Sequence, residues 1–257
     1  MMKRRSFVQL SLAGMPLSRA ANAPAAANDD REWYEWRNYE MRFGGNRVEF
    51  DNYFSKALIP FLNQQGVKKV GVFSEMGKDD PAHLHVLLVY PSIQSFATIQ
   101  NLLNTDQGFL ELSKNYQKSA PERPIFNRYT TSLMQAFNGL KQMIAPPPGA
   151  RIFEWRLYEG YNEDAVRRKV KMFNDEELPV FVKTKLNSVF FGEVVAGTNM
   201  PCLAYMLTFK DIAERDANWA NFIKDPEWKR MSADPQYAHT VSNIVRKFLE
   251  PLPYSQI

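Results

Sequence analysis

Apolar and polar positions in the first half of the chain follow two different periods. Residues 32–42 mix Trp and Tyr with charged residues at a period of two, which is typical of a strand with two unlike faces. After a Gly-containing turn, apolar residues recur at spacings of three and four through residues 50–62, which predicts a helix packed on a sheet. Two strands, a helical segment and a last strand are predicted next, at residues 67–76, 84–90, 93–118 and 125–137.

The second half repeats this order of predicted elements. A strand at residues 152–159 is followed by a helical stripe over residues 166–183. Two strands, a helical segment and a closing strand are predicted at residues 188–195, 202–209, 211–232 and 241–250. Each half therefore reads strand, helix, strand, strand, helix, strand, which is the order of a ferredoxin-like unit with an antiparallel sheet.

A short motif indicates that the two halves are copies of one unit. Glu35-Trp36-Arg37-Asn38-Tyr39-Glu40 returns as Glu154-Trp155-Arg156-Leu157-Tyr158-Glu159, 119 residues later. Matches that arose by chance would scatter over different offsets, so a constant offset indicates duplication of a whole folding unit. The same offset, without a gap, relates other identical pairs: Pro60 and Pro179, Val70 and Val189, Asp106 and Asp225, and Leu133 and Leu252.

The duplication also predicts how the halves pack. A sheet with helices on one side leaves its other apolar face exposed unless another surface covers it. Two fused copies can cover each other. The sequence therefore predicts an α+β protein of two tandem ferredoxin-like (βαββαβ) repeats that form a pseudo-dimeric α/β barrel within one chain, and further oligomers are compatible with this arrangement.

A Pro-rich stretch predicts the boundary between the halves. Residues 145–149, Ala-Pro-Pro-Pro-Gly, cannot continue a helix or a central strand. The predicted domains are residues 28–143 and 150–257, joined by a linker at residues 144–149.

The first 27 residues differ from the rest of the chain. Lys3-Arg4-Arg5 is a cationic start before Phe7, residues 10–17 form a short apolar run, and Ala25-Ala26-Ala27 offers small residues to a signal peptidase. This order resembles a bacterial twin-arginine signal peptide, cleaved after Ala27, and predicts a periplasmic or otherwise exported protein. A basic tail without a targeting role is the alternative interpretation.

Charge supports this division. The chain has 32 basic and 28 acidic residues, and four of the basic residues lie among the first 27, which contain no acid. The remainder is formally neutral, so the pI near 9.0 does not predict nucleic-acid binding, which needs a basic face on the folded domain. Cys202 is the only cysteine, which excludes an internal disulfide. No run of about 18 apolar residues is present, so no membrane span is predicted.

The repeated motifs resemble those of the NIPSNAP family. Both halves have the Glu-x-Arg-x-Tyr start, a Pro late in the first helix and an aromatic end to the third strand. The second half adds three further motifs: Glu214-Arg215, Asp225-Pro226-Glu227-Trp228 and Pro251-Leu252-Pro253-Tyr254-Ser255. The first half departs from the family at Gln94-Ser95-Phe96, where Glu-Arg is expected. The resemblance covers residues 32–255 and implies a dimeric α/β barrel of ferredoxin-like topology, but no particular reaction.

The repeated motif also contains the candidate site. A carboxylate, a guanidinium and a phenol on one face of a strand can hold an anionic or carbonyl-bearing ligand, with Arg as a bidentate donor. The alternative is that Glu and Arg neutralise each other on a central strand and only specify its register. Strand alternation places two such rows, one in each half: Glu35, Arg37 and Tyr39, and Glu154, Arg156 and Tyr158.

Metal and cofactor sites have little support in the sequence. His83 and His85 can face the same side of a strand, but a metal site needs three or four converging ligands. Haem is disfavoured because no histidine on a predicted helix offers an axial ligand. No Ser-His-Asp order, phosphate-binding Gly loop or paired Cys motif is present, so the sequence predicts no metal and no cofactor.

Two functions of different classes follow. The first is an exported protein that binds a small anionic or carbonyl-bearing molecule in a barrel cleft, with or without catalysis. The second is a non-catalytic protein-interaction module. A cavity into which Arg37 or Arg156 projects favours the first, whereas a closed core with these rows buried as ion pairs favours the second. The sequence does not decide whether the protein is an enzyme.

Overall fold

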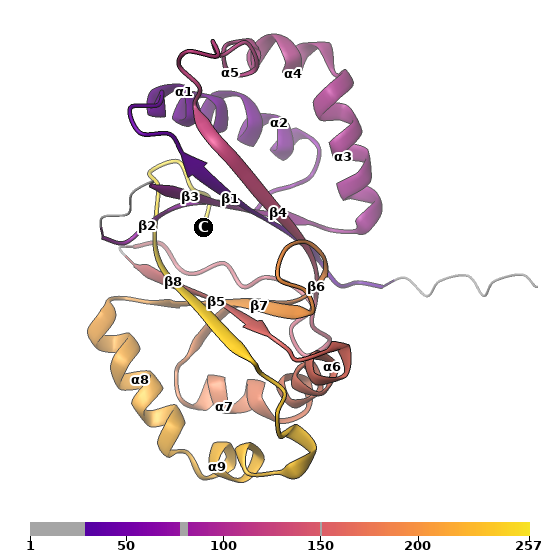
Figure 1. Ribbon diagram of the computed structural model, residues 1–257, viewed down its shortest axis with the longest axis vertical. Coiled ribbons are helices and arrows are strands. Elements are labelled where there is room, and N and C mark those ends of the chain that lie inside the picture. Colours follow the sequence, from indigo (N-terminus) through magenta and orange to yellow (C-terminus); the bar gives the residue numbers. More distant parts are fainter. Residues whose placement is uncertain (1–28, 78–81, 150) are drawn as a thin grey trace, which may run out of the picture.

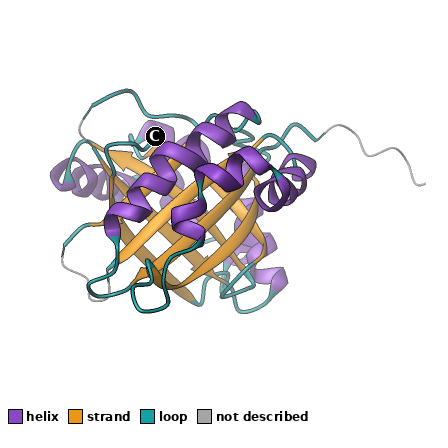
Figure 2. Cartoon of the chain, turned by 90° about the horizontal axis from the view of Figure 1, so that it is seen from above, coloured by secondary structure: helices purple, strands orange, loops and turns teal. Residues whose placement is uncertain are grey.

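Eight antiparallel strands close into one barrel, and the helices pack on its outside in two groups (Figure 1). The computed structural model describes residues 29–77, 82–149 and 151–257. The predicted signal peptide, residues 1–27, lies outside the described residues. From above, helices lie across strands that run obliquely beneath them (Figure 2). The α/β barrel predicted from the sequence is confirmed.

The elements follow each other in the same order in both halves. In the first half they are β1 (Trp33–Met41), α1 (Arg47–Asn52), η1 (Tyr53–Leu58), α2 (Ile59–Gln64), β2 (Val70–Glu75), β3 (His83–Tyr90), α3 (Ile93–Thr105), α4 (Gln107–Leu112), α5 (Lys114–Gln117) and β4 (Phe126–Ala136). In the second half they are β5 (Ile152–Glu159), α6 (Glu163–Met172), η2 (Phe173–Glu177), α7 (Leu178–Lys183), β6 (Asn187–Ala196), β7 (Cys202–Phe209), α8 (Ile212–Lys224), α9 (Pro226–Ser232), η3 (Pro235–Tyr237) and β8 (Asn243–Pro251).

The strand order explains how one chain closes the barrel. The order around it is β1-β3-β2-β8-β5-β7-β6-β4, so each half contributes four neighbouring strands. The halves meet where β2 pairs with β8 and where β4 pairs with β6. Each junction joins the last strand of one half to the second strand of the other, which leaves no free edge open to other chains.

The first helix of each half contains a π-helical turn. Tyr53–Leu58 forms this turn in the first half and Phe173–Glu177 forms it in the second. Pro60 and Pro179 follow directly, in the first turn of α2 and α7. Because proline has no N–H to donate, it is tolerated where the α-helical hydrogen-bond ladder is already interrupted.

Capping side chains begin the second helical segment of each half. Ser92 accepts a hydrogen bond from the Ser95 amide at 3.1 Å, and Asp211 accepts one from the Glu214 amide at 2.8 Å. These caps satisfy amides that have no carbonyl partner within the helix. The Asp211 cap determines where α8 begins, and α8 carries several residues of the candidate site.

Aromatic side chains from both halves fill the barrel interior. Trp36 stacks on Trp155 with ring centroids 5.3 Å apart and an interplanar angle of 6°. Phe73 meets Phe153 edge-on at 5.0 Å. Each large apolar side chain that is fully buried stabilises the fold by roughly 1.5–3 kcal/mol. The strands of the two halves therefore cover each other's apolar faces inside one barrel.

The offset of 119 residues does not hold to the end of the chain. Leu133 pairs with Glu35 in the first half, whereas Glu154 pairs with Phe248 in the second. Phe248 is therefore the structural counterpart of Leu133, and the predicted match to Leu252 was wrong. The connection that precedes β8 is shorter than the one that precedes β4, so the apparent Leu-Leu match was a coincidence of composition.

Within the described residues, no helix is both long and apolar enough to cross a membrane.

Candidate functional site

The repeated strand motif faces the helix layer in both halves. Tyr39 packs in the core between β1 and its helices, and Tyr158 occupies the same place in the second half. Trp36 and Trp155, one residue away from each arginine, point into the barrel instead. Strand alternation therefore brings each predicted Glu, Arg and Tyr row together, as expected.

In the first half this row is a closed network of hydrogen bonds. Glu35 accepts from Arg37 Nε at 2.5 Å, and the two side chains are only 5% and 7% exposed. Tyr90 and Thr131 donate to the same carboxylate at 2.8 and 3.1 Å. Burial raises the pKa of Glu35, but the Arg37 guanidinium and these hydrogen bonds outweigh burial and lower it. Within this network the Glu35 carboxylate and the Arg37 guanidinium neutralise each other.

The surroundings of the first row are apolar. Tyr39 lies edge-on to Phe50 and Phe54, with centroids 5.2 and 5.9 Å apart. None of the main cavities among the described residues is lined by Glu35, Arg37 or Tyr39. The first row therefore matches the structural alternative.

In the second half the carboxylate has a different partner. Glu154 is completely buried and accepts two hydrogen bonds from Arg215, from Nε at 2.9 Å and from Nη2 at 3.0 Å. Trp219 Nε1 donates to it at 2.8 Å. A bidentate guanidinium is the strongest partner that a carboxylate finds in a protein. Arg215 and Trp219 both come from α8, so this helix supplies the hydrogen bonds that Glu154 accepts, and Arg156 donates none of them.

Arg156 has no comparable partner. Its closest approach to Glu154 is 3.5 Å, from Nη1, and its buried Nε has no hydrogen-bond partner among the described residues. The guanidinium lies over the ring of Trp219, 4.4 Å from the centroid, and its side chain is 12% exposed. A buried donor without an acceptor costs free energy, so its presence calls for an explanation beyond packing.

Arg156 and Tyr158 line a cavity of about 540 Å³ between the sheet and the helices of the second half. Such a volume is within the range of small-molecule sites. Aromatic and aliphatic side chains make up much of the wall. The lining residues are Arg156, Tyr158, Lys169, Met172, Glu177, Arg215, Trp219, Phe222, Ile223, Trp228, Ser232, Tyr237, Thr240, Val241, Ile244 and Arg246.

A second arginine faces the first across the strand pair. Arg246 on β8 lies directly opposite Arg156 on β5, and both line the cavity. No described carboxylate forms an ion pair with Arg246, whose guanidinium packs over Phe248 at 5.3 Å. Like charges opposite each other on neighbouring strands destabilise a sheet. The pair therefore places two guanidiniums at one point of the cavity, and among the described residues only Glu154 forms an ion pair with either of them, at 3.5 Å from Arg156.

An ion pair lies on the helical wall of the cavity. Lys169 Nζ is 2.6 Å from Glu177 Oε2, and the two side chains are 6% and 3% exposed. Lys169 lies on α6 and Glu177 ends the π turn η2. Burial raises the pKa of Glu177 despite the neighbouring ammonium. Among the lining residues Glu177 is the only acid, whereas four residues are basic.

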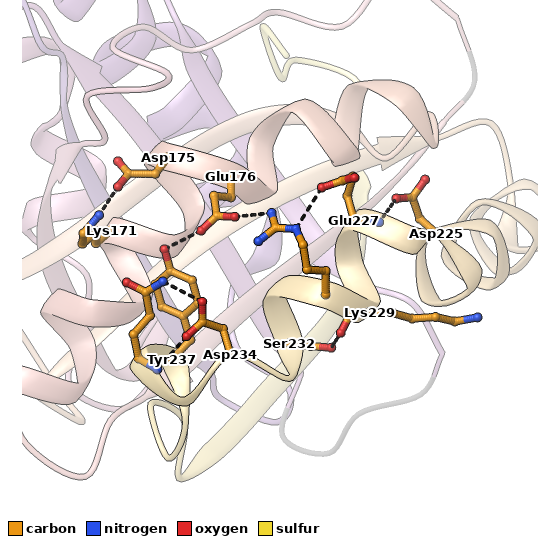
Figure 3. A network of polar contacts seen from close by, with 11 residues as sticks. Lys171, Asp175, Glu176, Asp225, Glu227, Lys229, Ser232, Asp234 and Tyr237 are labelled. Atoms are coloured by element: carbon orange, nitrogen blue, oxygen red, sulfur yellow. Dashed lines mark hydrogen bonds and ion pairs between the residues drawn. The ribbon is translucent and has the colours of Figure 1, made fainter.

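Polar contacts hold the outer wall in place. The segment of α9 and η3, residues 226–237, contributes Trp228 and Tyr237 to the cavity. Tyr237 donates to Glu176 at 2.7 Å, and Glu176 also pairs with Arg230 (Figure 3). Arg168 donates to the carbonyl oxygens of residues 236 and 238, each at 2.9 Å. The α9–η3 segment is thus tied to the helix that carries Lys169 and Glu177.

The predicted rows omitted much of this site. Lys169, Glu177, Trp219 and Arg246 were not among the predicted site residues, and Arg215 was noted only as part of a family motif. The sequence did contain a signal for four of these site residues. At the positions 119 residues earlier, the first half has apolar or neutral side chains in their place. The pairs are Lys169 and Phe50, Glu177 and Leu58, Arg215 and Phe96, and Trp219 and Gln100.

The histidines do not form a metal site with other described residues. His85 is buried, and its Nε2 lies 2.7 Å from Glu75 Oε1 at the junction between β2 and β8. No group of three or more His, Cys, Asp or Glu side chains among the described residues is arranged to hold a metal ion.

Comparisons with known proteins agree with this geometry at the level of the fold. The sequence model of the NIPSNAP family matches residues 153–256, the half that contains the cavity. A comparison with curated proteins found no similar sequence.

Solved structures extend the comparison to both halves. The chain is similar to a protein provisionally described as a monooxygenase from Fusobacterium nucleatum, with a TM-score of 0.56, 10% identity, and coverage of 86% of this chain and 93% of that chain. A protein described in the same way from Lactobacillus acidophilus is similar with a TM-score of 0.55 and 10% identity, and the match covers 86% of this chain and 94% of that chain. An uncharacterised NIPSNAP-like domain protein from Burkholderia xenovorans matches with a TM-score of 0.37 and 19% identity, and the match covers 41% of this chain and 88% of that chain. The first two likenesses show that the whole barrel is a known fold.

Proposed function

We propose that the protein binds a small organic anion, with a carboxylate as its anionic group, in the cavity of its second half. Arg156 and Arg246 hold that carboxylate. The observation that carries the proposal is the buried Nε of Arg156, which has no acceptor among the described residues and lines a cavity beside Arg246, which forms no ion pair with a described carboxylate.

The chemistry of the cavity favours a carboxylate on an apolar body. A guanidinium donates two parallel hydrogen bonds to a carboxylate, and two guanidiniums opposite each other gain most from one shared anion. The rings of Trp219, Phe222 and Trp228 line the cavity and supply apolar surface to the remainder of the ligand. Carbonyl-bearing ligands fit equally well, because Lys169 can donate to a carbonyl oxygen from the opposite wall.

Thermal unfolding with a panel of small carboxylates tests the proposal. The panel includes benzoate, phenyllactate and phenylpyruvate, with the methyl ester of phenylpyruvate as a neutral control. A ligand at about 100 times its Kd stabilises the folded state by about 2.7 kcal/mol, which raises Tm by about 5–10 °C in a protein of this size. Arg156→Met should abolish the rise.

Arg167→Met is the matched control, because Arg167 lies on α6 but pairs with Asp164 at the surface and is 70% exposed. It should keep the full rise in Tm. A panel without any effect on the wild-type protein, or an equal effect on the Arg156→Met variant, would overturn the proposed ligand site.

The second candidate is a non-catalytic interaction module. The closed network of Glu35 and Arg37 favours this function for the first half alone. In that case the first half presents its surface to partner proteins while the second binds the ligand.

We also propose that both halves are ferredoxin-like NIPSNAP domains, residues 28–143 and 150–257, that arose by duplication. The shared order of elements and the pairing of Trp36 with Trp155 across the barrel support this organisation. Expression of residues 150–257 alone tests it, because a lone half exposes its share of the barrel interior and should dimerise. A stable monomer would contradict it.

We further propose that residues 1–27 are a twin-arginine signal and that the mature protein is periplasmic. Arg4 and Arg5 before Phe7 support this. Replacement of both arginines by lysine should retain the protein in the cytoplasm. Unchanged fractionation would contradict the signal.

A further inference from the structure

We propose that Lys169 and Glu177 transfer a proton to and from a 2-oxo acid whose carboxylate is bound by Arg156 and Arg246. This inference rests on the proposed ligand site and adds a reaction to it. The substrate class is a 2-oxo acid with an aromatic ring and a hydrogen on the carbon next to the carbonyl.

The first argument is that the fold does not require this pair. At the equivalent positions the first half has Phe50 and Leu58, both buried, in a helix with the same π turn. A buried ion pair loses more solvation free energy than an apolar pair of similar size, so it is a poor device for stability. It occurs only in the half that has the cavity, and it lines that cavity.

The second argument is the position of the ammonium group. Lys169 Nζ lies 4.5 Å from the ring centroid of Phe173, 5.6 Å from that of Trp228 and 5.9 Å from that of Tyr158. The Arg156 guanidinium lies 5.4 Å from the same Tyr158 ring. The ammonium and the carboxylate-binding arginine therefore flank one ring, which suits a ligand with a carbonyl next to its carboxylate.

The third argument is the free capacity of Glu177. Only its Oε2 accepts a hydrogen bond from a described residue, which is Lys169, and this leaves Oε1 able to accept a proton. Burial raises the pKa of Glu177 above its ordinary value. A carboxyl whose pKa lies closer to neutral both accepts and returns protons more effectively.

The proposed step balances without any further reactant. Glu177 takes the proton from the carbon next to the carbonyl, and the C–H bonding pair becomes a new C=C bond. The carbonyl π pair moves onto oxygen, where the Lys169 ammonium donates a hydrogen bond to the developing enolate. Return of the proton from Glu177 to carbon or to oxygen gives the keto acid or its enol. In D₂O the protonated Glu177 exchanges its proton with the solvent and then returns a deuteron, so the abstracted hydrogen is replaced by deuterium.

Deuterium exchange into phenylpyruvate tests the inference with the full chain. Loss of the C3 proton signal in D₂O is followed by NMR, and binding is measured separately by calorimetry. Glu177→Gln keeps the shape of the side chain but removes the base, so exchange should slow by about 100-fold or more. The Kd for phenylpyruvate should stay within about threefold, because the carboxylate is held by the arginines.

Asp175→Asn is the matched control, because Asp175 lies two residues away and pairs with Lys171 at the surface (Figure 3). It should leave exchange unchanged. The double variant Lys169→Met with Glu177→Leu imitates the apolar pair of the first half. It should fold, bind phenylpyruvate and lose exchange, so a failure of Glu177→Gln to fold would not prevent the test.

Each outcome has one consequence. Exchange that is faster than in buffer, and that is lost with Glu177, supports the inference. Binding without accelerated exchange, or exchange that is unaffected by Glu177→Gln, overturns the inference and leaves the ligand site intact. Binding of other carboxylates but not of phenylpyruvate overturns the substrate class and thus the inference. Absence of any binding overturns the ligand site, and the inference with it.

Discussion

Replacement of Arg37 by methionine should destabilise the protein far more than the same replacement of Arg156. Arg37 is the cation for a carboxylate, Glu35, that is 5% exposed and 2.5 Å away. Removal of one partner from a buried ion pair costs about 3–5 kcal/mol, because the other charge stays buried. At 2–4 °C per kcal/mol for a large domain, Tm should fall by about 6–20 °C.

Arg156 lacks such a role. Glu154 keeps both hydrogen bonds from Arg215 when Arg156 is replaced. The variant loses the contact with the Trp219 ring, which is worth about 0.5–2 kcal/mol, and also loses a buried donor without an acceptor, which offsets much of that cost. Its unfolding free energy should change by about 1 kcal/mol or less.

Urea unfolding followed by circular dichroism at pH 7 measures both changes. The variants differ by the same atoms at equivalent places in the two halves, so each is the control for the other. Equal destabilisation of the two variants, or a greater effect at Arg156, would refute the assignment of a structural role to the first row and a ligand role to the second.

Three further predictions concern the site and the barrel. Arg246→Met should weaken phenylpyruvate binding about tenfold in calorimetry, because one of two guanidiniums is lost, without loss of stability in urea. Although burial raises the pKa of Glu75, its bonds to His85 and Lys247 lower it from 4.5 to about 2. A depressed carboxyl stabilises the fold above its unfolded pKa, so stability should fall between about pH 4.5 and 2, and Glu75→Gln should flatten this loss in urea titrations. Tyr237→Phe removes the bond to Glu176 and should speed amide exchange in the α9–η3 segment, with a cost of about 1 kcal/mol and no change in the first half.

The architecture was predictable because it depends on periodic patterns. Strand alternation placed each arginine on the same face of its strand as the neighbouring Glu and Tyr, and the repeated order of elements predicted two sheets that cover each other. The constant offset of 119 residues failed at β8, where Phe248, and not Leu252, is the counterpart of Leu133. Lengths of surface connections are weakly constrained by the core, so an offset carried across them is unreliable.

The site was only partly predictable because it depends on differences between the two halves. The shared motif predicted the same role for both rows, but residues outside the motif decide between them. Arg215 on α8 neutralises Glu154, whereas Phe96 at the matching place leaves Glu35 to Arg37. Which carboxylate pairs with which arginine depends on distances between elements far apart in the sequence, and periodicity does not contain that information.

The most direct test of the ligand site observes the arginine Nε–H groups by ¹⁵N NMR during a titration with phenylpyruvate. Arg37 Nε already donates to Glu35, whereas Arg156 Nε has no acceptor in the part of the chain that the structure describes. The Arg156 signal, assigned by its loss in Arg156→Met, should shift downfield as it gains a carboxylate acceptor, while the Arg37 signal stays in place. An unmoved Arg156 signal at saturating phenylpyruvate, or a shift at Arg37 instead, would contradict the proposed site.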